Sequence, residues 1–125
     1  MRTEHDIWTY GIDVGDVRGI AGYSVEALDG GIGKIDEATN EVGMASIVVD
    51  TGPWIFGRKV ILPAGVIERV DREDECVYVS RTKEQIKNAP ELGERTIADD
   101  AHRDELSQYY GPGGPGWRDY PPPGV

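Results

Sequence analysis

The chain has 125 residues, the length of one domain, and 38% of them are hydrophobic, which is enough for a packed core. Its 23 acidic and 13 basic side chains give a net charge of −10, which argues against direct binding to nucleic-acid phosphates. No apolar run approaches the roughly 18 residues of a membrane span. The N-terminus lacks the basic and apolar regions of a secretory signal, so we expect a cytoplasmic protein that does not insert into membranes.

Residues 1–18 form a polar N-terminal arm in which Ile7, Trp8 and Tyr10 stand out. An aromatic pair in a polar arm should either pack on the body of the protein or contact a partner, because exposed rings leave apolar surface in water. We favour packing on the body and keep both aromatic residues as interface candidates.

The segment 19–81 has the pattern of β-structure, with short apolar runs that are separated by glycine, proline and charged turns. Asp29-Gly30-Gly31 should form a tight hairpin turn, and residues 37–43 a loop. Short strands without intervening helices favour a closed barrel or a sandwich. The expected strands are at 23–28, 32–35, 45–50, 59–62, 66–70 and 76–79.

Two aromatic residues, Trp54 and Phe56, follow a Gly-Pro turn and bring much apolar area to one edge of this body. We expect them to anchor the core or its contact surface. If Phe56 is a core residue, Phe56→Ala should cost about 3–5 kcal/mol. If Trp54 lies at an interface, its truncation should dissociate an oligomer and leave the monomer folded.

The pattern becomes helical after the last strand. Thr82 and Gln85 have the spacing of a capping box at the start of a short helix. The segment 93–110 should hold a second helix, which begins at Asp99 or Asp100 and carries apolar side chains on one face.

In the tail of residues 111–125, ten of the fifteen residues are glycine or proline. Such a segment buries little apolar surface, so we expect it to be extended or disordered, with residues 111–116 as a flexible tether. Trp117 and Tyr120 nevertheless precede a proline triplet, a composition that suits binding in an aromatic-lined groove. The tail is therefore a candidate binding element.

We find no pattern typical of catalysis, a cofactor or a metal. Cys76 lies in an apolar run, where a buried thiol is expected, and no base is near it in the sequence. His5 and His102 are far apart, lack zinc-site spacing and should lie on the surface. The acidic turn 71–75 lacks the glycine and closing glutamate of a calcium loop. We therefore expect no catalytic, cofactor-binding or metal-binding residues, and a protein that is not an enzyme.

Three stretches, in this order, resemble a bacterial PRC-barrel protein: residues 28–35 (LDGGIGKI), 47–63 (IVVDTGPWIFGRKVILP) and 81–92 (RTKEQIKNAPEL). The family includes the cytoplasmic domain of the photosynthetic reaction-centre H subunit and the C-terminal domain of a ribosome maturation factor. The resemblance implies a mainly β fold, with a small, strongly bent barrel over residues 19–92, one or two short C-terminal helices and an extended tail. It also implies that the barrel is a docking module without an active site.

Stand-alone members of the family, which this chain resembles most, suggest self-association. The first hypothesis is therefore a homo-oligomeric docking or scaffold protein, most simply a dimer, with a further protein partner of unknown identity. One alternative is an accessory factor in RNA processing or ribosome assembly, and another is a small-ligand binder or an enzyme. The candidate interface consists of the aromatic residues Trp8, Tyr10, Trp54, Phe56, Trp117 and Tyr120.

Overall fold

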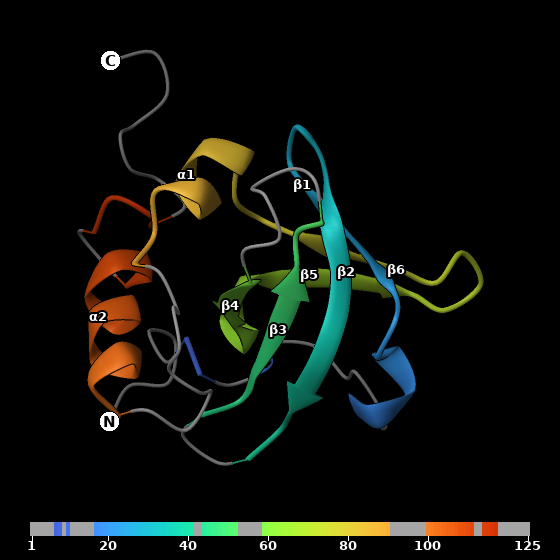
Figure 1. Ribbon diagram of the computed structural model, residues 1–125, viewed down its shortest axis with the longest axis horizontal. Coiled ribbons are helices and arrows are strands. Elements are labelled where there is room, and N and C mark those ends of the chain that lie inside the picture. Colours follow the sequence, from blue (N-terminus) through green and yellow to red (C-terminus); the bar gives the residue numbers. More distant parts are fainter. Residues whose placement is uncertain are drawn as a thin grey trace.

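The computed structural model describes residues 7–8, 10, 17–41, 44–52, 59–90, 100–111 and 114–117. In this part the protein is mainly β, with six strands, two short 3-10 turns and two α-helices (Figure 1). The 3-10 turns are η1 (Val17–Ile20) and η2 (Ala64–Val66), and the helices are α1 (Lys83–Lys87) and α2 (Asp100–Tyr110). The fold class expected from the sequence is thus confirmed as mainly β.

The strands form one mixed sheet with the order β4-β3-β2-β1-β6-β5, in which β1 and β6 are parallel and the other neighbours antiparallel. All six expected strands are present, but β2 runs on to residue 39, so the loop expected from residue 37 begins later. Pairing with β3 extends β2 past a bulge at residue 36. The bulge interrupts the alternation of apolar residues, so the sequence pattern does not indicate this extension. The strands are β1 (Ser24–Ala27), β2 (Gly30–Thr39), β3 (Ser46–Asp50), β4 (Lys59–Pro63), β5 (Ile67–Asp71) and β6 (Cys76–Val79).

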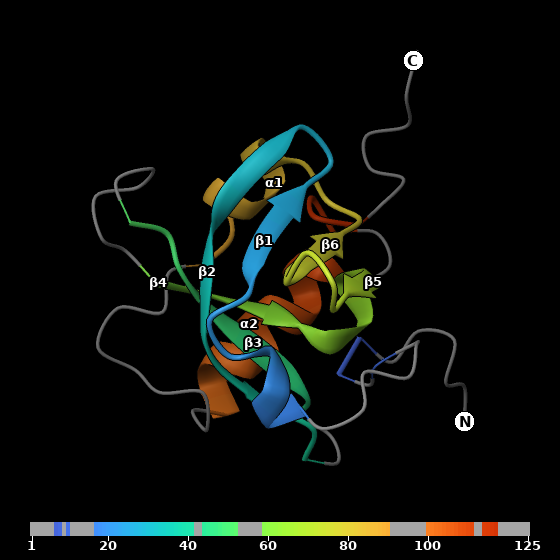
Figure 2. The same cartoon turned by 90° about the vertical axis from the view of Figure 1, so that its right-hand side faces the viewer.

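The sheet bends strongly, and its two edge strands meet at the corner formed by η2 (Figure 2). The corner is held on both sides: the Ala64 amide donates to the Ala45 carbonyl, and the Ser80 amide to the Val66 carbonyl, each over 2.9 Å. No ladder joins β4 to β5 among the described strands, so the hydrogen-bonded sheet is open there. The closed barrel expected from the sequence is therefore found only as a bent sheet.

The core lies inside the bend and is covered by α2 (Figures 1 and 2). Every strand contributes buried apolar side chains to it, and Ile86 of α1 is fully buried. On α2 the buried residues are His102, Leu106 and Tyr110, which share one face at a spacing of four. The surface position expected for His102 is wrong, since the helix places this side chain in the apolar stripe with 1% of its surface exposed.

The N-terminal arm packs on the body where it is described. The Gly65 amide donates to the Ile7 carbonyl over 2.7 Å, and the Trp8 indole donates to the Ser107 hydroxyl over 2.7 Å. A side chain at Gly65 would meet the Ile7 backbone at 2.9 Å, so the close crossing requires glycine. Trp8 is 8% exposed, and its expected packing on the body is confirmed.

From the environment of the Tyr10 hydroxyl we expect the free energy of unfolding to fall at alkaline pH. This hydroxyl donates to the Thr39 carbonyl over 2.9 Å, and burial raises its pKa to about 12. In the unfolded chain the phenol ionises near pH 10, so its contribution to stability is complete below pH 10 and is lost as the pH rises towards 12. Tyr10→Phe should lower the free energy of unfolding by about 1 kcal/mol at pH 7.

Urea denaturation of the wild type and Tyr10→Phe between pH 8 and pH 11.5 measures this effect. The difference between the two proteins should shrink above pH 10, because only the wild type carries the phenol. A difference that stays constant across the range would contradict this prediction.

Candidate functional site

The candidate site lies at the C-terminal end of α2, where residues 114–117 fold back between α2 and α1 (red trace in Figure 1). We call residues 114–117 the C-terminal segment. Four side chains from two places in the sequence surround it, and we call them the clamp. The clamp consists of Arg81, Gln85, Tyr109 and Tyr110.

Arg81 provides the charge at the centre of the clamp. It lies two residues after the end of β6, has 2% of its surface exposed, and donates from Nη1 to the carbonyl and hydroxyl oxygens of Ser80 over 2.9 and 2.7 Å. Its Nε donates to the carbonyl of Gly116. Because a buried guanidinium is costly unless its N–H groups are bonded, these acceptors fix where the side chain points.

Two aromatic rings lie near the Arg81 guanidinium. Its central carbon lies 5.9 Å from the ring centre of Tyr110 and 5.9 Å from that of Trp117. Tyr110 is fully buried, and burial raises its pKa far above the ordinary range. Among the described residues its hydroxyl has no hydrogen-bond partner, so Tyr110 contributes mainly its ring.

Gln85 connects the start of α1 to the segment. Its amide hydrogen and side-chain oxygen complete the capping box with Thr82, which confirms the helix start predicted from the sequence. The side-chain nitrogen of the same residue donates to the carbonyls of Pro115 and Trp117 over 3.4 and 3.3 Å. The Gln85 carbonyl accepts the Tyr109 hydroxyl over 2.6 Å, which joins α1 to α2.

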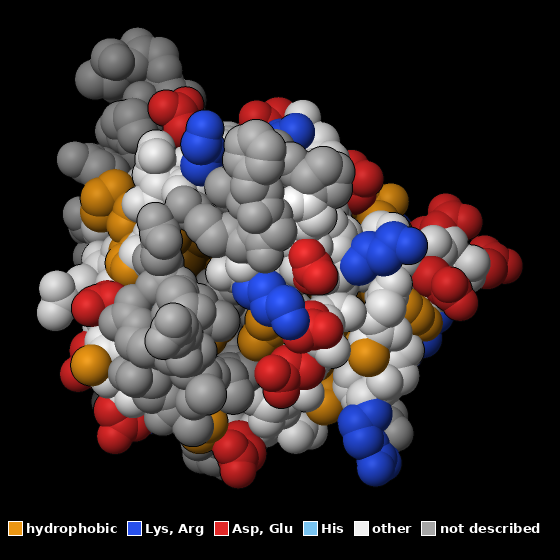
Figure 3. All heavy atoms as spheres, in the orientation of Figure 1, with side chains coloured by type: hydrophobic (Ala, Val, Ile, Leu, Met, Phe, Trp, Pro, Cys, Tyr) orange, Lys and Arg blue, Asp and Glu red, His pale blue; other side chains and the backbone are white. Residues whose placement is uncertain are grey.

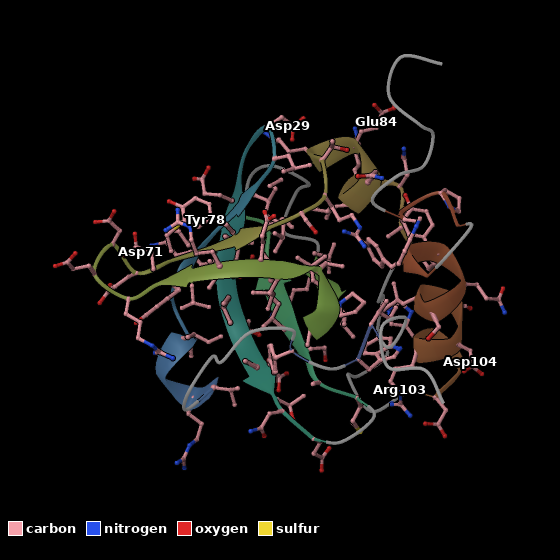
Figure 4. The ribbon with its side chains drawn as sticks, turned by 180° about the vertical axis from the view of Figure 1, so that it is seen from behind. Asp29, Asp71, Tyr78, Glu84, Arg103 and Asp104 are labelled. Carbon is pink, nitrogen blue, oxygen red and sulfur yellow. The ribbon has the colours of Figure 1, made fainter. Side chains whose placement is uncertain are left out.

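The hairpin of β1 and β2 braces this region from the other side. The Leu28 amide donates to the Arg81 carbonyl over 2.8 Å, and the Asp29 carboxylate accepts from the Lys83 amide over 2.8 Å. Figure 4 shows Asp29 at the hairpin tip beside α1. The backbone from the Arg81 carbonyl to the Lys83 amide is thereby held by the hairpin.

Glycine is required at one position of the bound segment. The Gly116 amide donates to the Tyr109 carbonyl over 2.9 Å, which brings its backbone onto the two tyrosine rings. A Cβ atom at Gly116 would lie 2.4 Å from the Tyr109 ring and 2.9 Å from the Tyr110 ring. Those rings pack edge to face at 4.9 Å, so neither can move aside without losing that contact.

This arrangement recognises a peptide backbone. Side-chain donors of the clamp reach the carbonyls of three consecutive residues, glycine alone fits the middle one, and an aromatic side chain at the third lies beside the guanidinium. Within the described ranges, no group of three or more His, Cys, Asp or Glu side chains could hold a metal ion. The chemistry that the site supports is binding of a segment with a glycine followed by an aromatic residue.

Of the residues predicted as an interface, the structure brings one into this site. Trp117 packs partly buried against the core, whereas Trp8 and Tyr10 belong to the N-terminal arm and bond to Ser107 and Thr39. Trp54, Phe56 and Tyr120 lie outside the described residues.

The flexible tether predicted for residues 111–116 is wrong where the structure describes it. The described glycines of this stretch, at positions 111, 114 and 116, are buried and hydrogen-bonded to α2 or within a turn. Arg81 and Gln85 were missed as binding residues. The only signal was a lone arginine between an apolar strand and a helix cap, which ordinarily marks a surface position.

The face shown in Figure 3 mixes charges of both signs. Acidic side chains gather at the tip of the β5–β6 hairpin, where Figure 4 places Asp71. Leu28, which is 63% exposed, is the large apolar side chain that stands out of the described surface. The described helices include none with the length and apolar character needed to cross a membrane.

Comparison with known proteins adds no assignment: neither the protein-family models nor the curated proteins include a match to this chain.

Proposed function

We propose that the chain is a non-enzymatic protein-docking module of the PRC-barrel type, which self-associates in the cytoplasm and binds a further protein. The observation that carries this proposal is the clamp around the C-terminal segment. A buried donor at Arg81 and a half-buried donor at Gln85 hold a peptide backbone there, and binding of an extended segment in this way is a property of docking modules.

The bent sheet supports the barrel part of the proposal. The three residues of η2 lead from one edge strand into the other, and hydrogen bonds tie the two ends of this corner to Ala45, just before β3, and to Ser80, just after β6. A sheet whose edges converge in this way has the curvature that a small barrel requires.

The test separates the clamp from its bound segment. A chain that lacks residues 112–125 should expose an empty clamp and lose about 2–4 kcal/mol of stability, because the packing of Trp117 and its neighbouring hydrogen bonds is removed. A synthetic peptide, GPGGPGWRD, which repeats residues 111–119, should bind this truncated chain with a Kd on the order of 0.1–1 mM. Anisotropy of the labelled peptide measures the binding, and circular dichroism checks the fold.

The matched control is the same peptide with alanine in place of the glycine equivalent to Gly116. It should bind at least about tenfold more weakly, since the added Cβ meets both tyrosine rings. If the truncated chain fails to fold, full-length Gly116→Ala replaces it, and there Trp117 should shift to a water-exposed fluorescence spectrum. Equal binding of both peptides by the truncated chain, or an unchanged spectrum of the full-length variant, would refute the docking proposal.

A further inference from the structure

The N-terminal arm and the clamp both contact the last turn of α2. We propose that the arm regulates the clamp: docked residues 7 and 8 hold this turn where the clamp can bind its segment, and their release weakens that binding. This inference rests on the proposed docking function and adds the regulation of the same site. The residue through which the arm acts is Ser107 of α2.

The backbone of the arm is fixed to the corner of the bent sheet. The Gly65 amide of η2 donates to the Ile7 carbonyl over 2.7 Å, and the Ala45 amide donates to the Trp8 carbonyl over 3.2 Å. The backbones of Gly65 and Ile7 are so close that a Cβ at Gly65 would meet Ile7 at 2.9 Å. The docked arm therefore has a defined position on the sheet.

From this position the Trp8 side chain reaches α2 (dark blue trace in Figure 1). Its indole Nε1 donates to the Ser107 hydroxyl over 2.7 Å, and only 8% of the residue is exposed. Within the described ranges, no backbone hydrogen bond joins α2 to a strand, so side chains set the position of the helix. The indole bond ties α2 to the corner of the sheet.

The same turn of α2 builds one side of the clamp. Ser107 and Tyr109 both lie in it, and the Tyr109 carbonyl accepts the Gly116 amide over 2.9 Å. The other side of the clamp, Arg81 and Gln85, belongs to the chain that follows β6. Because a helical turn shifts as a unit, a displacement of Ser107 carries Tyr109 away from Arg81 and widens the clamp.

This connection makes the arm and the segment two contacts of one movable element. A docked arm favours a filled clamp, and by linkage a filled clamp must favour a docked arm to the same extent. The last turn of α2 is held firmly only when both are in place. Loss of either contact should therefore loosen the other, although the two do not touch the same side chains.

Hydrogen exchange in the full chain tests the first direction. Ser107→Ala removes the hydroxyl that accepts the indole and keeps a residue that suits a helix. We expect the protection of the Gly116 amide to fall at least about fivefold further than that of the amides in the β3–β4 ladder. Tyr10→Phe is the matched control, because it removes an arm bond to the Thr39 carbonyl, away from α2. In the control the Gly116 amide should follow the ladder.

The second direction uses the amide that reports on the arm. Gly116→Ala should lower the protection of the Gly65 amide, which donates to the Ile7 carbonyl, at least about fivefold relative to the same ladder. Two results would overturn the inference. One is a Gly116 amide that only follows the ladder in Ser107→Ala, and the other is a Gly65 amide that only follows it in Gly116→Ala.

The docking proposal fails separately, when the truncated chain without residues 112–125 binds the glycine and alanine peptides equally. Exchange measures the chain's own segment and decides the coupling in that case too. Where the glycine peptide binds preferentially, Ser107→Ala in the truncated chain should raise its Kd at least about fivefold. An unchanged Kd would overturn the coupling and leave the docking proposal standing.

Discussion

Replacing Gly33 by alanine should lower the free energy of unfolding by about 3–5 kcal/mol, which combines overpacking with an unfavourable backbone conformation. Gly33 lies within β2 at a φ of +147°, and a Cβ there would lie 2.1 Å from the Asp50 carbonyl oxygen and 2.9 Å from the Thr51 Cα. Those atoms belong to the backbone at the end of β3, so no side chain can turn away to make room. The strand itself would have to move.

Gly22→Ala is the matched control. Gly22 also has a positive φ, +89°, but no atom lies within 4 Å of the place where its Cβ would be. It should therefore cost only about 1 kcal/mol, the conformational part of the effect. Urea denaturation of both variants measures the difference. Similar losses for the two variants would contradict the close approach of β2 to the end of β3.

The strands could be predicted because their cause is local. Runs such as Ile47-Val48-Val49 are β-branched and bounded by turn residues. The hairpin between β1 and β2 was also predicted, although its turn residues are Leu28 and Asp29, and Gly30 and Gly31 already pair within β2. The helix start at Thr82 could be predicted for the same reason, since a capping box involves only neighbouring residues. Each of these elements depends on a few adjacent side chains.

The positions that were predicted wrongly depend on distant contacts. Gly116 looks like part of a disordered tail, and only the rings of Tyr109 and Tyr110 reveal that it is held. His102 looks like a surface residue until α2 is placed on the core. Whether β4 pairs with β5 and closes the sheet likewise depends on how far the sheet bends, which no run of residues encodes. Composition describes what a segment can do alone, and tertiary contacts decide the rest.

The clamp shows why a buried arginine escapes prediction from sequence. Charged residues are rarely buried without partners, and the acceptors of Arg81 include backbone and hydroxyl oxygens at Ser80 and Gly116. These acceptors leave no charge pattern in the sequence. One of them is 35 residues away, in a stretch that composition alone describes as polar and loose. The buried charge therefore depends on the C-terminal segment and in turn holds it.

Arg81→Ala should consequently lower the free energy of unfolding by about 3 kcal/mol, through lost charge-assisted hydrogen bonds and lost packing of the stem on the rings. Arg81→Lys should recover little, because an ammonium group cannot reproduce the planar fork that serves Ser80 and Gly116 at once. Arg69→Ala is the control. Arg69 also lies over an aromatic ring, at 4.1 Å from Tyr78, but its side chain is 59% exposed, so it should cost less than about 1 kcal/mol.

A double-mutant cycle assigns the loss to the C-terminal segment. If Arg81 stabilises the protein mainly by holding Gly116 and Trp117, removing residues 112–125 already removes most of its contribution. The combined variant should then lose less than the sum of the two single effects, by at least about 1 kcal/mol. Urea denaturation of the four proteins gives this coupling energy. Strictly additive losses would mean that Arg81 acts through contacts outside the C-terminal segment, and the segment would then be a neighbour of the buried charge and not its ligand.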